Sequence, residues 1–201
     1  MSNAIDPQEI ARADTIAFHF YTKLFYVINQ ARATEGPNPN AKSDKWFNLE
    51  SPDSELLPKE ARDAFKSISS LIPSPGIEPF EVQVLLSVPV SNMVLVHTPP
   101  DSSRVTIEPK PRFVLLESWT LDFDPSDVYN SGIPAATTYK HGIVLFRSLF
   151  SLLRLLPTWK LYQRLRRKMG GINRNANFGI QLRVRSYSGK DDILSFGECN
   201  E

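Results

Sequence analysis

The segment from 135 to 156 constrains the fold most, because it is long, helical in its periodicity and almost wholly apolar. Apolar side chains occur on every side of the expected helix. The basic residues Lys140, Arg147 and Arg154 recur every seven positions. Residues seven apart share a helix face, so these charges form one narrow polar stripe. The sequence therefore predicts a rod that is buried on most sides.

A second long helix is predicted near the N-terminus. Asp6 can cap this helix, Pro7 suits its first position, and Glu9 is placed to return a capping bond. Apolar residues then recur at helical spacing as far as about Ala33, and they occupy more than one face. We therefore expect a central helix with packing partners on several sides.

Runs rich in β-branched and aromatic residues predict strands at 80–88, 93–98, 104–123 and 178–187. The first two runs are separated by a short turn-rich segment and predict a hairpin or meander. The third is interrupted by a turn at Pro109 to Pro111. The fourth alternates apolar and polar residues, which indicates one buried face.

The polar, proline-bearing segment 35–57 is predicted to be a long loop. The order of helix, loop, strands, helix and strand predicts an α+β fold, with a mostly antiparallel sheet packed against long helices. The length of 201 residues favours a single domain over 1–201, with an ordered core over about 7–190.

Composition and termini argue against several classes of protein. The formal net charge of +1 gives no global reason to expect a nucleic-acid or membrane partner. The first ten residues lack the basic start and apolar run of a secretory signal, and the most apolar window, 143–156, is too short for a membrane span. The single cysteine, Cys199, cannot form an intrachain disulfide. We expect a cytoplasmic protein without a transmembrane segment.

Catalytic and metal-binding patterns are not found in the sequence. His19, His97 and His141 fall on three different expected elements, at spacings that do not suggest a metal site. Cys199 would need a neighbouring base to act as a nucleophile. We expect no enzyme activity, no metal and no cofactor.

Charge is unevenly distributed along the chain. Nine basic residues and no acidic residue occur between Lys160 and Lys190, so the rest of the chain carries minus 8. This stretch can be a solvated face that balances the acidic residues around Glu50 to Asp63. It can also bind an anion, because Arg183 and Arg185 point the same way from one strand and a guanidinium can grip phosphate through two hydrogen bonds.

Nucleic acid and a membrane are two other conceivable ligands of the basic stretch. Nucleic acid is not expected, because the stretch has few aromatic residues to stack on bases. A membrane could be contacted by a basic helix at 158–169, with Trp159, Leu161, Tyr162 and Leu165 at the interface. The alternative is that the apolar residues of this helix pack in the core.

Trp46 and Phe47 are candidate partner-binding residues, because they are aromatic residues in a segment that is otherwise polar. Packing of both side chains back onto their own domain is the alternative. Trp119 lies among apolar residues of an expected strand, which favours a core position.

Three motifs resemble one known family. They are Glu117 to Trp119, Leu145 to Phe150 and Arg154 to Pro157, in that order within about 50 residues. The strand ending in Glu-x-Trp, the Leu-Phe-Arg-Ser-Leu-Phe helix and the Arg-Leu-Leu-Pro sequence are similar to those of the autophagy-related protein 13 family. The resemblance covers most of residues 7–187.

The resemblance implies a HORMA fold and a non-catalytic scaffold of the autophagy-initiation kinase complex. It implies binding to a HORMA protein like autophagy protein 101, to autophagy protein 9 and to the phosphatidylinositol 3-kinase complex, with recruitment to the preautophagosomal structure. The family's kinase-binding tail is not in this sequence, so direct kinase binding is not expected. The resemblance also implies a pair of basic residues that senses a phosphorylated partner, without assigning the pair to particular positions. The candidate anion-binding residues are Arg112, Arg174, Arg183 and Arg185. A phosphoprotein- or phosphoinositide-binding module is the alternative function.

Overall fold

The computed structural model describes residues 7–34, 38, 40–71, 78–89, 94–123, 133–169, 178–185 and 193–195. Its helices are α1 (Pro7–Arg32), α2 (Lys59–Asp63), α3 (Ala135–Leu155) and α4 (Thr158–Met169), with short 3-10 helices η1 (Trp46–Asn48) and η2 (Ile68–Leu71). Its strands are β1 (Ser43–Asp44), β2 (Ser51–Pro52), β3 (Phe80–Ser87), β4 (Val96–His97), β5 (Val105–Thr106), β6 (Phe113–Leu121), β7 (Gly179–Val184) and β8 (Ile193–Leu194).

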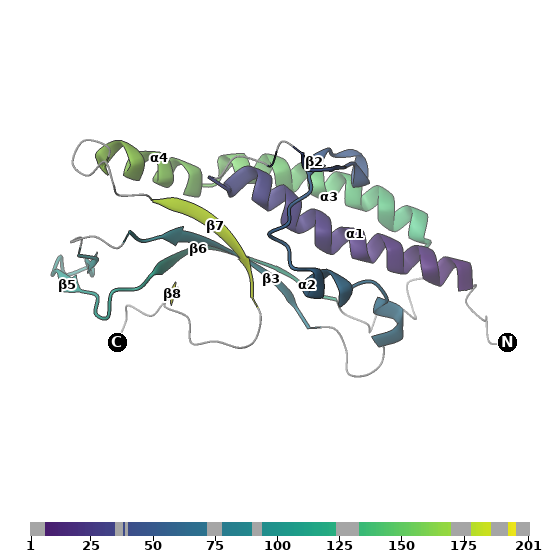
Figure 1. Cartoon of the computed structure of the whole chain (residues 1–201), viewed down its shortest axis with the longest axis horizontal. Coiled ribbons are helices and arrows are strands. Elements are labelled where there is room, and N and C mark those ends of the chain that lie inside the picture. The colour runs from purple at the N-terminus through teal and green to yellow at the C-terminus, as the bar shows by residue number, and fades with distance from the viewer. Residues whose placement is uncertain are drawn as a thin grey trace.

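The main sheet has the strand order β7-β3-β6-β8, and a layer formed by α1, α3 and α4 lies along one side of it (Figure 1). The β3 strand pairs antiparallel with both β6 and β7, whereas β8 runs parallel to β6. The α+β class predicted from the order of elements is confirmed.

Helix α1 is central, as its apolar pattern predicted. All eight residues from Tyr21 to Ile28 are buried, because α1 packs against α3, β7 and the β1–β2 segment. The carboxylate of Glu9 accepts a hydrogen bond of 2.9 Å from the backbone N–H of Ala135, at the N-terminus of α3. A negative charge there stabilises the unpaired N–H groups of the helix start. Asp6 lies outside the described residues.

Strand β3 forms the centre of the sheet, and Val82 to Leu86 are all buried. Strand β7 alternates as predicted, with Ile180 and Leu182 buried and Gln181 exposed. The predicted hairpin between the segments 80–88 and 93–98 is not present in the described residues. Both edges of β3 are occupied by β6 and β7, so β4 pairs with β5 in a separate two-stranded sheet.

The segment predicted as a loop over 35–57 contains regular structure. Within its described residues, β1 and β2 pair antiparallel, with Ser43 opposite Pro52 and Asp44 opposite Ser51, and η1 lies between them. The polar, proline-bearing composition of this segment did not predict β1, β2 or η1. Contacts with α1 stabilise them, rather than an apolar pattern within the segment.

Candidate partner-binding surface

Helix α3 turns one narrow stripe toward the domain. Its buried residues are Ala135, Gly142, Phe146 and Leu153, spaced by seven, four and seven positions. The Phe146 ring lies 5.4 Å from the ring of Phe20 on α1 and 4.9 Å from that of Phe47 in η1. This stripe fixes which side of α3 faces away from the core.

The opposite side of α3 is apolar and exposed. Val144 is 66% exposed, Leu145 50%, Leu152 45% and Leu155 76%. We call these four residues the outer stripe. The prediction of a rod buried on most sides is wrong, because α1 and η1 pack against one side of α3 and no described element covers the other. Exposed apolar patches of this kind mark interaction sites on soluble proteins.

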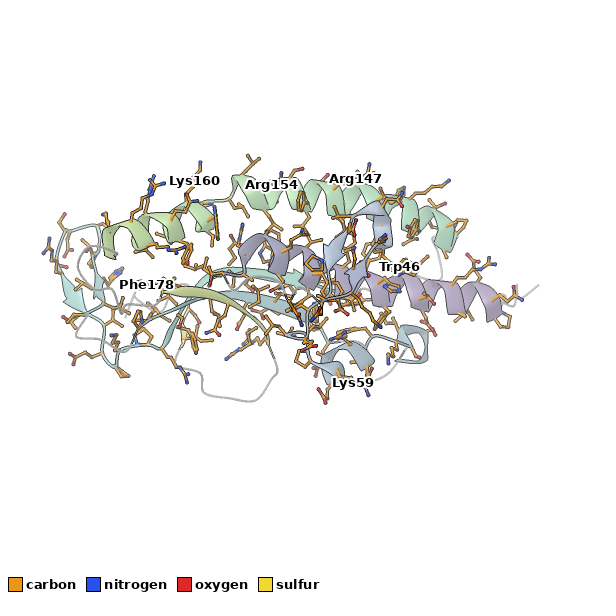
Figure 2. All side chains as sticks on the ribbon, turned by 45° about the horizontal axis from the view of Figure 1, so that its top comes forward. Trp46, Lys59, Arg147, Arg154, Lys160 and Phe178 are labelled. Carbon is orange, nitrogen blue, oxygen red and sulfur yellow. The ribbon has the colours of Figure 1, made fainter. Side chains whose placement is uncertain are left out.

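The predicted polar stripe is present beside the outer stripe, since Lys140, Arg147 and Arg154 are all exposed. Figure 2 shows Arg147 and Arg154 on the helical layer that borders the molecule. The guanidinium of Arg154 also lies over the ring of Phe150, 4.2 Å from its centre.

By length and composition alone, Ala135–Lys168 could cross a membrane, and 28% of its most apolar window is buried. Helices of folded domains can meet the same criterion. Here α3 packs on α1 through Phe146 and carries charged residues within its length.

A buried ion pair holds the C-terminal end of α3. The side chain of Arg32, 1% exposed, donates two hydrogen bonds to Glu117 Oε1, at 2.9 and 3.1 Å, and one of 2.7 Å to the carbonyl of Leu153. The indole of Trp119 donates to Glu117 Oε2 at 3.0 Å. Burial acts to raise the pKa of Glu117, but hydrogen bonds from Arg32, Thr158 and Trp119 outweigh it and lower this pKa below its ordinary value.

Sequence reasoning missed this ion pair and the exposure of the outer stripe. The Glu-x-Trp motif was the available signal for the pair, since Glu117 and Trp119 project from the same face of β6. No local pattern pointed to Arg32, because its partner lies 85 residues away.

Trp46 and Phe47 pack back onto their own domain, which was the alternative to partner binding. Phe47 is 0% exposed, so it offers no surface to a partner. Trp46 is half-buried and stacks on His19 of α1 with 3.6 Å between ring centres. The expected core position of Trp119 is also supported, because the residue packs against the core cluster.

Lys23 anchors the β1–β2 segment to α1. Its fully buried ammonium pairs with the carboxylate of Asp44 and donates hydrogen bonds to the Leu49 carbonyl, at 2.6 Å, and to Ser51 Oγ, at 2.9 Å. Burial lowers the pKa of Lys23, although Asp44 acts to raise it. Burial also lowers the pKa of the neighbouring His19 to about 4, with a contribution from the charge of Lys23 and against the opposing effect of Asp44.

The four candidate anion-binding arginines are not brought together in the described residues. Arg183 pairs with Gln83 in the sheet, whereas the carbonyl of Arg112 accepts a hydrogen bond from the backbone N–H of Val88, which follows β3 and lies five positions beyond Gln83. That offset separates the two backbones by about 17 Å. Arg185 forms an ion pair of 3.0 Å with Glu81. Arg174 lies outside the described residues, and a phosphate site at these arginines stays a prediction.

Fold and surface define the class: an α+β domain in which long helices cover a largely antiparallel sheet and one helix presents an exposed apolar face. The chain belongs to the autophagy-related protein 13 family, whose model matches residues 18–199. The resemblance seen in the sequence is confirmed, and with it a role in autophagy.

Curated relatives match nearly the whole chain. Autophagy protein 13 of Schizosaccharomyces pombe is 27% identical over 198 residues, which covers 92% of this chain and 24% of that protein. Autophagy-related protein 13a of Arabidopsis thaliana is 24% identical over 206 residues, covering 93% of this chain and 31% of that protein. The chain therefore spans about a quarter of the length of the relatives it matches.

A solved structure titled "Atg13 HORMA domain" is also similar. It is 20% identical, covers 69% of this chain and 63% of its own, and superposes with a TM-score of 0.38. A score this low carries no argument, so the HORMA fold that the family resemblance implies stays a prediction.

Proposed function

We propose that this domain is a non-catalytic adaptor that binds other autophagy proteins through the outer stripe of α3. The exposure of Val144, Leu145, Leu152 and Leu155 on one helix face carries the proposal. Water contact with these side chains is unfavourable, and covering one Leu or Val contributes about 1.5–3 kcal/mol before the costs of association. A stripe of four can therefore serve as the apolar centre of an interface with a polar rim.

The partner that suits this surface best is a second HORMA-type protein, like autophagy protein 101. A helix face binds well against another helix, because rows of side chains on one fit the grooves of the other. Family membership supports such a partner but leaves its identity as part of the proposal. Autophagy protein 9 and the phosphatidylinositol 3-kinase complex are further proposed partners.

The wider role follows from these partners. We infer that the domain acts in the cytoplasm and is recruited to the preautophagosomal structure. It joins the initiation kinase only through a tail segment that lies outside the region matched in its relatives. No chemistry is assigned to it, because the buried charges among its described residues, Lys23 and Arg32, are engaged in holding the fold together, Arg32 with Glu117.

The proposal is tested by titrating the domain with the HORMA partner from the same source and measuring affinity by calorimetry. Val144→Glu with Leu155→Glu should weaken binding at least 100-fold, because two charges would have to be buried in the interface. The matched control is Leu56→Glu with Val94→Glu, which alters side chains that are 55% and 64% exposed elsewhere. Equal affinity of the two double variants would refute the outer stripe as the binding surface.

A further inference from the structure

Helices α3 and α4 lie in a part of the chain that contains only one sign of charge. Residues 133–169, all of them described, contain eight Lys or Arg residues and no Asp or Glu. Figure 1 shows the two helices following one another along the same border of the molecule. Their outward surface is therefore positive along its whole length, although the net charge of the chain is only +1.

Six of these residues form a row that we call the basic ridge: Lys140, Arg147 and Arg154 on α3, and Lys160, Arg164 and Arg167 on α4. All six are exposed. On α3 the spacing of seven residues puts successive charges about 10 Å apart, and the two helices together are about 50 Å long. Figure 2 shows Arg147, Arg154 and Lys160 along the outer layer, whereas Lys59 lies on the opposite side of the molecule.

The charges of the ridge are directed to solvent. In the described part of the chain no ion pair involves any of the six, in contrast to the cations Lys23 and Arg32, which are buried against carboxylates. A carboxylate partner for the ridge must therefore come from the segments outside that part or from another molecule.

The shape of the ridge determines what it can bind. Recognition of one phosphate needs several donors that converge on one point, whereas these cations are distributed along a rod. A row of separate charges matches an array of separate anions in a plane, as in the headgroup layer of an anionic membrane.

The junction of α3 and α4 adds apolar groups at the same border. Trp159 is 38% exposed and Leu161 41%. Indole side chains prefer the boundary between water and lipid, because they combine an apolar ring with a polar N–H. Tyr162 is buried on the inner side of α4, so the helix keeps its packing and does not need to unfold to present these groups.

We propose that the basic ridge binds the anionic leaflet of a membrane, with Trp159 at the lipid boundary. Contact is peripheral and depends on charge. On α3 the ridge and the outer stripe occupy neighbouring sides of the helix, so one domain can hold a protein partner and a membrane at once. The membrane contact does not depend on the protein partner.

The experiment measures co-sedimentation of the chain with vesicles of phosphatidylcholine containing 30% phosphatidylserine, and with vesicles of phosphatidylcholine alone. We expect binding to the anionic vesicles only, decreasing as salt is raised. Each basic residue near such a surface contributes a factor of about five to the partition coefficient. The ridge variant Arg147→Gln, Lys160→Gln, Arg164→Gln should therefore bind on the order of 100-fold more weakly.

The matched control removes three exposed charges from other faces: Lys59→Gln, Lys66→Gln, Arg104→Gln. It should bind within a few-fold of the unchanged chain. A blue shift of tryptophan fluorescence on vesicle binding, absent from Trp159→Phe, would place the helix junction at the lipid boundary.

Four results would overturn the proposal. The first is no binding of the unchanged chain to anionic vesicles. The second is a ridge variant that binds as tightly as the unchanged chain, and the third is a control that loses as much affinity as the ridge variant. The fourth is a single-stranded DNA oligonucleotide that binds through the ridge more tightly than vesicles do, which would assign the surface to nucleic acid.

Discussion

Close packing around one glycine fixes how α3 sits on the domain. A Cβ atom at Gly142 would lie 2.5 Å from Cε1 and 2.6 Å from Cδ1 of Phe47, and 2.9 Å from Cζ of Phe20. Phe47 itself has a backbone φ of 57°, a left-handed conformation that is unfavourable for a residue with a large side chain. Burial of its ring between α1 and α3 offsets that cost.

Gly142→Ala should destabilise the protein. Alanine favours the helix by about 1 kcal/mol, but overpacking against the fully buried Phe47 ring costs about 1–3 kcal/mol and should outweigh this, with a net loss of up to about 2 kcal/mol. Denaturant unfolding followed by circular dichroism measures the change. Gly179→Ala is the control, because its nearest atom is Thr34 Oγ1 at 3.4 Å, and an equal loss there would contradict the packing argument.

At the scale of elements, the β1–β2 segment depends on α1 for its position. Two strands of two residues each cannot hold one another, so the Lys23 and Asp44 pair and the stacking of Trp46 on His19 keep the segment in place. His19 must remain neutral to keep this arrangement, because burial and Lys23 oppose its protonation.

This packing predicts a loss of stability in weak acid. The pKa of His19 falls from 6.5 to about 4 on folding, so the unfolded chain binds more protons between these values and the free energy of unfolding decreases as pH falls through that window. Between pH 7 and pH 5 the loss should reach about 2 kcal/mol. His19→Gln should remove this part of the pH dependence, measured as denaturation midpoints. An unchanged slope in that variant would show that other groups are responsible.

At the scale of the whole molecule, the Arg32–Glu117 pair connects the two layers. It joins the end of α1 to β6, to the last turn of α3 through the Leu153 carbonyl, and to the start of α4 through Thr158. Residues far apart in the sequence thus meet in one buried network, which links the position of the helices to that of the sheet.

Glu117→Gln should destabilise the whole domain by about 3–5 kcal/mol, because it leaves the Arg32 guanidinium buried without a counter-charge. Protection from hydrogen exchange should fall together in α1, β6 and α3. Asp63→Asn is the control, because it breaks an ion pair with Lys66 that is exposed to solvent, where such pairs contribute little. Comparable effects of the two substitutions would argue against a structural role for the buried pair.

The sequence by itself determined the elements whose periodicity is strong and local. It predicted the span of α1, the span of α3, the buried alternation of β7, the α+β class and, through the Glu-x-Trp and neighbouring motifs, the family. These features depend on residues within a few turns or strand positions of one another. Three of the candidate arginines, Arg174, Arg183 and Arg185, came from a local count of charge between Lys160 and Lys190.

Only the tertiary structure decided which apolar surfaces are covered. Periodicity shows that α3 is apolar on several sides, but not that α1 and η1 pack against one side and leave Leu155 and Val144 exposed. It also could not show that β3 is flanked by β6 and β7, or that Arg32 meets Glu117. Such contacts join residues that are distant in the chain, and their energies depend on burial and neighbours that only the folded arrangement provides.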